Sequence, residues 1–353
     1  MDVDVVIVGG GPAGCSSALS LLARGCSVAV VSQPNRREKP TETSAPALKQ
    51  MLQSLGAEAA LSACEPCFGI VSDWGRNTPI LQPGMVSPFG HAWFIHRARF
   101  DACLKQMACD RGALWIQSEA HEVEFNAKGV RLEISGEVIK ARWLIAANGS
   151  PSWAANTTHQ LPATFDSLIA FWARLPVRLD ERLLCIEVAN YGWWYVCPDD
   201  VAGVFACCVT DATEARATGI AQISSWNERF EATNLLKLLS AHTIPGAINS
   251  VSVSTTFLPC RHGQSWVAVG DAAVKLDPLG SSGTITALDS GQRAATAVAD
   301  ALNGNMANIE KYASWSTGLL ESFTRQRAKH YVLESHKQNG GFWDRRTKLD
   351  KAR

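Results

Sequence analysis

A glycine-rich turn between two apolar segments lies near the start of the chain, and it restricts the fold more than any other feature. Residues 3–8 are a continuous apolar run, residues 13–24 repeat Ala and Leu at helical spacing, and residues 27–31 are apolar again. Apolar runs without alternation are typical of strands buried on both faces of a parallel sheet. The segment therefore predicts a βαβ unit and, with it, an α/β fold.

The turn has the G-x-G-x-x-G spacing of a dinucleotide-binding site. Gly9 allows a tight turn, Gly11 lets the backbone approach a pyrophosphate, and Gly14 lets the helix pack closely on the strand. The helix beginning near Pro12 and Ala13 would direct free N–H groups and its positive dipole end at the phosphates. We therefore expect all five residues to bind a dinucleotide.

The second strand lacks the acidic residue that commonly binds the adenosine ribose. Ser32 and Gln33 stand at its end instead, and Arg36 and Arg37 follow closely. This segment alone leaves two interpretations open. Either the arginines bind the 2′-phosphate of NADP, or Ser32 and Gln33 bind the ribose through neutral hydrogen bonds, which are weaker than charge-assisted ones.

A second glycine turn, far along the chain, favours the ribose interpretation. In "WVAVGDAAVKLDPLGSSGTITALDSGQRAA" an apolar strand ends in Gly270 and Asp271. Together with the first turn, this segment resembles the two-part FAD site of flavoproteins with the aromatic-hydroxylase fold. The resemblance implies that Asp271 binds a ribityl hydroxyl of FAD, and that the loop before the next helix places backbone N–H groups against the flavin ring. The loop residues concerned are Gly280, Ser281, Ser282 and Gly283.

Two further segments match that family in part. "HRARFDACLKQMA" resembles the helix whose arginine contacts the cofactor, which implies that role for Arg97. "ARWLIAANGSPS" stands where the family has a strand ending in an Asp-Ala-Thr-Gly or Asp-Gly motif, but Ala146 replaces the aspartate and Asn148-Gly149 replaces Thr-Gly. This departure argues against the NADPH-binding single-component hydroxylases of the family.

Three segments point to a branch of the family. "TETSAPALKQMLQSLG" resembles a motif of flavin-dependent halogenases, carried here by Glu42, Ser44 and Pro46. "GWWYVCP" (residues 192–198) resembles a strand of halogenases and geranylgeranyl reductases. "HYVLESHKQNGGFWDRR" resembles the ending of maturation flavoproteins that modify a tryptophan in quinone-cofactor enzymes, such as lysine ε-oxidase and glycine oxidase. The residues that match this ending are Tyr331, Glu334, Phe342, Trp343 and Arg346, whereas Ser335 and His336 depart from it.

Halogenases use a lysine to capture hypohalous acid, and the corresponding segment here has none between Lys49 and Lys105. We therefore rank a hydroxylase above a halogenase. The resemblance implies that NADH or NADPH reduces FAD, and that the reduced flavin activates O₂ to transfer an oxygen atom to an electron-rich aromatic ring. The protein must then hold that ring close to the flavin and exclude water.

The sequence offers fewer candidates for catalysis than for cofactor binding. Trp193 and Tyr195 alternate with Trp194 on a predicted strand, so one side of it would either line a substrate cleft or pack in the core. Glu42 and His96 are acid–base candidates by position, with structural hydrogen bonding as the alternative. Cys64 and Cys67 form a C-x-x-C pair, but no second pair and no nearby histidine complete a zinc site.

The expected architecture is a Rossmann-like three-layer FAD-binding domain with an inserted antiparallel-sheet substrate domain and a helical C-terminus. The boundaries follow composition: residues 1–158 form the first part of the FAD domain, 159–258 the β-rich substrate domain with one covered face, and 259–353 the second part with C-terminal helices and a basic tail. Lys and Arg together number 33, as do Asp and Glu, so no global charge favours nucleic acid or a membrane surface. No apolar run suits a membrane helix, no leader segment is visible, and eleven scattered cysteines indicate reduced thiols in the cytoplasm.

The sequence thus predicts an FAD-dependent monooxygenase whose substrate is an aromatic ring. We expect a peptidyl tryptophan of a partner protein, modified during tryptophylquinone biogenesis, and we expect an aromatic and basic C-terminus to anchor that partner. The alternatives are a halogenase or double-bond reductase acting on a small molecule, or a non-catalytic maturation partner that keeps an FAD site.

Overall fold

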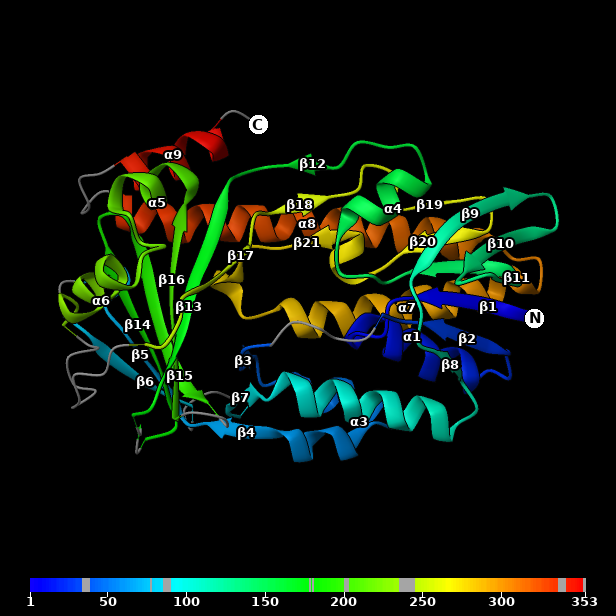
Figure 1. Cartoon of the computed structure of the whole chain (residues 1–353), viewed down its shortest axis with the longest axis horizontal. Coiled ribbons are helices and arrows are strands. Elements are labelled where there is room, and N and C mark those ends of the chain that lie inside the picture. Colours follow the sequence, from blue (N-terminus) through cyan, green and yellow to red (C-terminus); the bar gives the residue numbers. More distant parts are fainter. Residues whose placement is uncertain are drawn as a thin grey trace.

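The computed structural model describes residues 1–33, 39–76, 78–84, 90–177, 179, 181–199, 203–234, 245–335 and 341–351. Two lobes lie side by side in it, each built on its own sheet (Figure 1). Arg36 and Arg37, the candidate ligands of a 2′-phosphate, and His336, a departure from the C-terminal motif, fall outside the described residues.

The first lobe contains an eight-stranded sheet with a parallel centre. Its parallel strands, in spatial order, are β20 (Trp266–Ala268), β11 (Glu137–Ala146), β1 (Asp2–Val8), β2 (Val28–Val31) and β8 (Leu114–Ile116). Antiparallel strands complete it: β19 (His262–Gly263) beside β20, and β10 (Gly129–Ile134) with β9 (Ala120–Asn126) beside the first half of β11. The parallel centre matches the apolar runs in the sequence, because its strands are covered on both faces.

Side chains alternate between the two faces of this sheet. Val5 and Ile7 of β1 belong to the core cluster under the helices, whereas Val6 and Val8 belong to the cluster on the other face. The first face is covered by α1 (Pro12–Leu22), α2 (Leu48–Ser54), α3 (Arg97–Asp110) and α7 (Gly283–Leu302); the β9–β10 hairpin and α4 (Pro151–Thr157) cover the second. The expected Rossmann-like three-layer arrangement is confirmed.

The second lobe contains a seven-stranded sheet in which one pair of strands is parallel. Its spatial order is β17 (Asn249–Ser252), β13 (Leu168–Leu175), β16 (Gly203–Asp211), β15 (Gly192–Asp199), β14 (Leu183–Ala189), β5 (Gly69–Ser72) and β6 (Ile80–Pro83). β5 pairs parallel with β14, while the other pairings are antiparallel. Two of the strands therefore come from chain that precedes residue 159, although the other five lie within the expected β-rich segment.

Both faces of the second sheet are covered, so the expectation of one covered face is wrong. Trp193 and Tyr195 pack toward α8 (Ala307–Ser335) and α9 (Gly341–Lys351), whereas Trp194 packs on the opposite face against Trp226 and Phe230 of α6 (Ile223–Glu231). A buried strand with a Trp-Trp-Tyr run has large aromatic groups on both sides, so two covering layers are required.

Smaller elements connect the lobes. One three-stranded sheet has the order β3 (Glu42–Ser44), β7 (Ala92–Ile95), β4 (Cys64–Cys67), and another has the order β12 (Ala163–Thr164), β18 (Thr256–Phe257), β21 (Val274–Lys275). The short helix α5 (Ala212–Thr218) follows β16, and single 3₁₀ segments occupy Glu58–Ala63, Gly270–Ala272 and Pro278–Gly280. α8 spans both lobes, because Ile309 and Tyr312 pack in the first core and Tyr331 packs in the second (Figure 1).

The described residues contain no helix with the length and apolar character needed to cross a membrane. The same residues hold no group of three or more His, Cys, Asp or Glu side chains that could bind a metal ion. The cysteines, all of which lie in described parts of the chain, are free thiols. Cys64 and Cys67 are among them, and burial raises the pKa of Cys64 to about 12, so this C-x-x-C pair has little thiolate character.

Candidate functional site

The first glycine turn joins β1 to α1 and leaves open space at one of its three motif glycines. Gly9 has φ +113°, and a Cβ there would lie 2.2 Å from the carbonyl oxygen of Ala147. A Cβ at Gly14 would lie 1.9 Å from the carbonyl oxygen of Gly9, so Gly14 is needed for packing. A Cβ at Gly11, by contrast, would meet no atom within 4 Å. Gly11 precedes Pro12 at the helix start without a side-chain cap, so its surroundings fit an approaching pyrophosphate.

Ser32 follows the last residue of β2 and lies directly beside this turn. Its backbone N–H donates to the carbonyl oxygen of Ile116 at 3.0 Å. A Cβ at Gly10 would lie 2.8 Å from the Ser32 hydroxyl oxygen, so this hydroxyl and the turn are close neighbours. Gln33 comes next, and its carbonyl oxygen lies 3.4 Å from the same hydroxyl. Ser32 thus lies beside the glycine turn, and its predicted contact with the adenosine ribose stays a prediction.

The two distant glycine turns meet. Gly270 has φ +56°, and a Cβ there would lie 2.8 Å from the Cβ of Ala13 in α1. The backbone N–H of Gly270 donates to the Ser290 hydroxyl of α7 at 2.8 Å. A Cβ at Gly291 would lie 2.3 Å from the Ala13 carbonyl oxygen, so α1 and α7 are in backbone contact. The expectation that both turns belong to one site is therefore supported by direct packing.

Asp271 follows this second turn in a 3₁₀ segment and is held in an unusual electrostatic environment. Burial raises its pKa to about 6, and the positive charge of Lys275 only partly offsets that effect. Lys275 is itself desolvated, which lowers its pKa, and its ammonium group donates to the carbonyl oxygen of Ser252. The pKa of this carboxyl group lies close to neutral pH. A hydrogen bond from a hydroxyl group would stabilise its charged form.

The loop from Asp277 to the start of α7 presents its backbone rather than its side chains. The Asp277 carboxylate accepts the backbone N–H of Leu279 at 2.9 Å and thereby caps the Pro278–Gly280 turn. Ser281 then adopts φ +45°, and Ser282 precedes α7 without a side-chain cap. A Cβ at Gly283 would meet no atom within 4 Å. Unsatisfied N–H groups at the start of a long helix, next to open space, fit a flavin ring.

Arg97 lies at the start of α3, but its guanidinium is already paired. It contacts Glu42, and its Nε and Nη2 atoms each lie 3.2 Å from the Asp101 carboxylate. Burial would lower the pKa of Arg97, yet the charges of Glu42 and Asp101 raise it. Glu42 also accepts the Thr284 hydroxyl of α7 at 2.8 Å. Arg97 therefore joins β3, α3 and α7, and its predicted contact with the cofactor stays a prediction.

The other acid–base candidate, His96, is buried one residue earlier at the α3 N-cap. Its Nδ1 atom lies 3.5 Å from the Thr41 hydroxyl and its Nε2 atom 3.5 Å from Glu65. Thr41 in turn donates to Asp199 at 2.6 Å. Glu42 and His96 thus lie on neighbouring segments, but each is engaged in contacts that hold those segments together.

Trp193 and Tyr195 lie on the same face of β15 and pack in one cluster. Tyr195 is half-buried and packs in the same cluster as Leu279. Burial raises its pKa well above the usual value, and the Glu42 charge adds to that effect. Trp193 is 2% exposed, and its ring contacts Trp74 with centroids 6.0 Å apart. Of the two aromatic candidates, Tyr195 is the more exposed.

Comparison with known proteins finds several flavoproteins that are similar to this chain in sequence or fold. A family model described as lycopene cyclase protein matches residues 4–166. A protein of Marinomonas mediterranea named as an FAD-dependent oxidoreductase, LodB, is 24% identical over 97% of this chain and 96% of its own length. The flavin-dependent halogenase CmlS superposes with a TM-score of 0.86 at 20% identity, covering 98% of this chain and 68% of its own. The peptidyl tryptophan dihydroxylase QhpG, essential for tryptophylquinone cofactor biogenesis, superposes with a TM-score of 0.79 at 21% identity, covering 98% of this chain and 79% of its own.

The chain has the fold of the FAD-dependent halogenase, monooxygenase and geranylgeranyl reductase-like superfamily.

Within this superfamily fold, the C-terminal motif is part of the core. Tyr331, Phe342 and Trp343 are fully buried, and Glu334 and Arg346 are 1% and 2% exposed. The Trp343 indole donates to the carbonyl oxygen of Ala189 at 2.9 Å and so fixes α9 on the second sheet. The expectation that the aromatic and basic C-terminus anchors a partner is therefore wrong for these residues, because their side chains are buried in the core of this chain.

Some residues of the candidate site were not found from the sequence. Thr284 and Lys39 were missed because their partners, Glu42 and Asp101, are distant in the chain and no local pattern marks them. Asp101 could have been found, since it stands four residues after Arg97 on a predicted helix. Asp277 could also have been found, because Asp before Pro is a turn signal.

Proposed function

We propose that this chain is an FAD-dependent monooxygenase that hydroxylates a tryptophan side chain of a partner protein during tryptophylquinone biogenesis. The observation that carries the FAD assignment is the contact between the two glycine turns at Ala13 and Gly270. The tryptophan substrate is supported by the likeness to QhpG over nearly the whole chain and by the C-terminal segment from Tyr331 to Arg346.

The residues of the site have separate roles in this proposal. The N-terminus of α1 with Gly9, Gly11, Pro12, Ala13 and Gly14 binds the pyrophosphate, and Ser32 and Gln33 bind the adenosine ribose. Asp271 accepts a ribityl hydroxyl, and the backbone of residues 280–283 faces the ring. When bound, FAD supplies the two-electron and oxygen chemistry that no side chain of the protein can provide.

Each hydroxylation inserts one atom of O₂ between carbon and hydrogen of the indole ring and reduces the other atom to water. The two electrons come from NADH or NADPH, which is oxidised to NAD⁺ or NADP⁺. One proton is taken up from solvent. The protein positions the indole and excludes water. Tyr195 suits both tasks, because it is half-buried next to the flavin loop and its neighbours Trp193 and Phe205 fix its ring at centroid distances of 5.7 and 5.6 Å.

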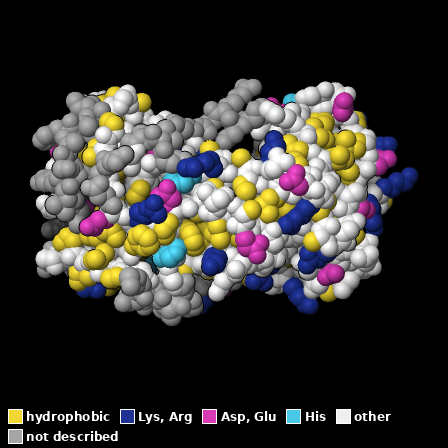
Figure 2. Space-filling model, turned by 90° about the horizontal axis from the view of Figure 1, so that it is seen from below, with side chains coloured by type: hydrophobic (Ala, Val, Ile, Leu, Met, Phe, Trp, Pro, Cys, Tyr) yellow, Lys and Arg dark blue, Asp and Glu magenta, His cyan; other side chains and the backbone are white. Residues whose placement is uncertain are grey.

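A protein substrate also needs a surface to bind. Phe68, Ile80 and Leu81 are 50%, 39% and 50% exposed, and the last two lie on β6, the edge strand of the second sheet. Figure 2 shows hydrophobic side chains gathered over part of the face seen from below, while Lys, Arg, Asp and Glu are interspersed over the rest. Grouped exposed hydrophobic residues commonly mark protein contacts, which supports a macromolecular substrate over a small one.

The test is oxygen labelling of a defined partner. The purified protein, FAD, NADH or NADPH and ¹⁸O₂ are incubated with the tryptophan-containing precursor of a quinoprotein oxidase. We expect a peptide mass increase of one or two labelled oxygen atoms on a tryptophan. A Gly11→Val variant, whose side chain would fill the pyrophosphate space, is the matched control and should give no product.

The same incubation separates the alternatives. With chloride and bromide present, halogen on the substrate would indicate a halogenase, and loss of an alkene in a small-molecule substrate would indicate a reductase. The absence of lysine from residues 50–104 disfavours the first. Bound FAD that neither NADH nor NADPH nor dithionite reduces would instead indicate a non-catalytic maturation partner.

A further inference from the structure

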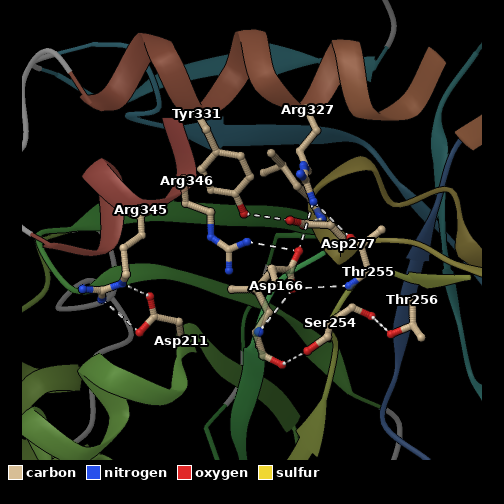
Figure 3. Close-up of polar contacts among 12 residues, drawn as sticks. Asp166, Asp211, Ser254, Thr255, Thr256, Asp277, Arg327, Tyr331, Arg345 and Arg346 are labelled. Atoms are coloured by element: carbon tan, nitrogen blue, oxygen red, sulfur yellow. Dashed lines mark hydrogen bonds and ion pairs between the residues drawn. The ribbon is translucent and has the colours of Figure 1, made fainter. Parts of the chain in front are cut away.

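A buried ionic cluster lies between α8, α9 and the flavin loop, outside the residues assigned so far to the cofactor. We define it as Asp166, Asp277, Arg327, Tyr331 and Arg346 (Figure 3). Each side chain is almost fully buried: at most 3% of any of the five is exposed. Two carboxylates face two guanidinium groups, so the buried charges balance. Such a cluster is costly to desolvate, and removing one member leaves an uncompensated charge.

Asp166 is the point at which the two C-terminal helices meet. Its Oδ2 atom lies 3.0 Å from Nη1 of Arg327 on α8 and 3.1 Å from Nη1 of Arg346 on α9. Its Oδ1 atom accepts the backbone N–H groups of Leu168 and Thr255, both at 3.3 Å. Asp166 therefore connects α8 and α9 to the start of β13 and to the chain leading into β18.

Asp277 extends the cluster to the flavin loop. The Tyr331 hydroxyl of α8 donates to Asp277 Oδ2 at 2.9 Å, while Oδ1 of the same carboxylate caps Leu279. Burial raises the pKa of Asp277, and the Arg346 charge is the largest influence in the opposite direction. The Arg346 guanidinium lies over the Tyr331 and Phe342 rings, 5.5 and 5.3 Å from their centroids, which fixes its orientation.

The loop that Asp277 caps carries the backbone groups of the proposed cofactor site. Asp277 orders the Pro278–Gly280 turn, Ser281 follows with φ +45°, and Ser282 begins α7. A non-glycine residue at positive φ is kept only where its surroundings determine it. The Asp277 carboxylate ties this turn to α8 through the Tyr331 hydroxyl, in addition to the apolar packing of Leu279 in the hydrophobic cluster that contains Tyr331.

We propose that Tyr331 and Arg346 are positioning residues, which hold Asp277 so that the loop of residues 278–283 keeps its N–H groups fixed at the flavin ring. The C-terminal helices are then a support for the cofactor site rather than a surface for a partner. This inference rests on the proposed FAD site, but its structural part, the ordering of the loop by the cluster, does not require bound flavin.

Adjacent residues on α9 provide a matched control. Arg345 pairs with Asp211 and Glu214 at 2.8 Å, and its side chain is 38% exposed, whereas Arg346 points into the cluster (Figure 3). The test compares Arg346→Lys, Arg345→Lys and Tyr331→Phe. The last removes a single hydroxyl, so it should fold even if the arginine variant does not.

The first measurement is hydrogen–deuterium exchange of the flavin-free protein. We expect peptides covering residues 278–284 to exchange about 5-fold faster in Tyr331→Phe than in wild type, the effect of losing its buried hydrogen bond to Asp277. Arg346→Lys removes the guanidinium that lies over the Tyr331 ring and pairs with Asp166, and exchange should rise by a similar factor. Peptides from β1 should exchange unchanged, and Arg345→Lys should match wild type throughout. Loop exchange equal to wild type in Tyr331→Phe, or faster exchange spread equally over β1, overturns the proposal.

The second measurement is FAD affinity by fluorescence titration. Both cluster variants should bind FAD about 5-fold more weakly, with Arg345→Lys unchanged. If wild type takes up no FAD, the proposed function fails, while the exchange experiment still decides whether the cluster orders the loop. If FAD binds and all variants bind it equally well, the positioning role is refuted and the FAD site stands.

Discussion

The Cα atom of Gly14 packs against the carbonyl oxygen of Gly9, so closely that a Cβ at Gly14 would lie 1.9 Å from that oxygen. Gly11, between them, has open space where a Cβ would stand. The same motif therefore contains one glycine required for folding and one whose missing side chain leaves room for a ligand. Mutation should separate these two roles.

Gly11→Ala should leave the free energy of unfolding within about 0.5 kcal/mol of wild type and weaken FAD binding at least about 10-fold, because the methyl group enters the pyrophosphate space. Gly14→Ala should destabilise the protein by about 2–3 kcal/mol, since backbone must move to admit the methyl group. Urea denaturation and FAD titration measure the two effects. Equal FAD affinity of Gly11→Ala and wild type would contradict the assignment of this turn.

FAD affinity should depend on pH through Asp271. Its pKa of about 6 in the flavin-free protein means that the carboxylate is charged above pH 7 and becomes protonated as the pH falls. The charged carboxylate only accepts hydrogen bonds, and it is this form that accepts the ribityl hydroxyl. FAD affinity should therefore be highest at pH 8 and about 10-fold lower at pH 5. In Asp271→Asn the affinity should be nearly constant between these values. If FAD affinity depended on pH in Asp271→Asn as it does in wild type, Asp271 would not belong to the FAD site.

The buried pair between Arg174 and Asp199 should contribute strongly to stability. Nε of Arg174 lies 2.5 Å from Asp199, whose side chain has no exposed surface and also accepts the Thr41 hydroxyl. Asp199→Ala removes the carboxylate that pairs with this buried guanidinium and should cost about 3–5 kcal/mol. Glu124→Ala breaks an exposed pair with Arg131 and should cost less than about 1 kcal/mol. Chemical denaturation measures the free energy of unfolding of both variants. Similar losses in the two would contradict a strong contribution of the buried pair.

Trp194 should matter for folding and not for the site. It is fully buried, its indole donates to the Tyr191 hydroxyl at 3.0 Å, and its ring packs on Trp226. Trp194→Ala should lower the free energy of unfolding by about 3–5 kcal/mol through the cavity it leaves. Leu161→Ala, at a side chain that is 86% exposed, should change it by less than about 0.5 kcal/mol. At a temperature where Trp194→Ala is folded, its FAD affinity should equal that of wild type.

The parts of the fold that were predictable are those encoded locally. The glycine turns at Gly9 and Gly270, the apolar strands beside them and the helix beginning at residue 283 each follow from a short pattern, and the structure contains all of them. The α1–α7 contact was also predictable, because two halves of a cofactor site must meet. Apart from this contact, each of these features depends on residues within one turn, one strand or one helix.

What could not be predicted depends on partners remote in the chain. The pairing of β5 with β14 and the second covered face of the Trp194 strand come from segments that carry no signal of their neighbour. Arg97 was identified from its position before Phe100 and Asp101, yet its pairing with Glu42 joins residues 55 apart. The C-terminal motif was found, but whether its aromatic residues face inward or outward is set by the sheet beneath them.

The composition of the seven-stranded sheet has a practical consequence for protein engineering. Because β5 and β6 come from the first third of the chain, and α9 and the end of α8 from its last part, the second lobe is assembled from stretches far apart in the chain. A fragment cut at residues 159 and 258 would expose the edge of β14 and the bare aromatic face around Trp193, and it should aggregate. Chimeras that exchange substrate preference between relatives must therefore carry residues 64–95, 307–335 and 341–351 along with the central segment.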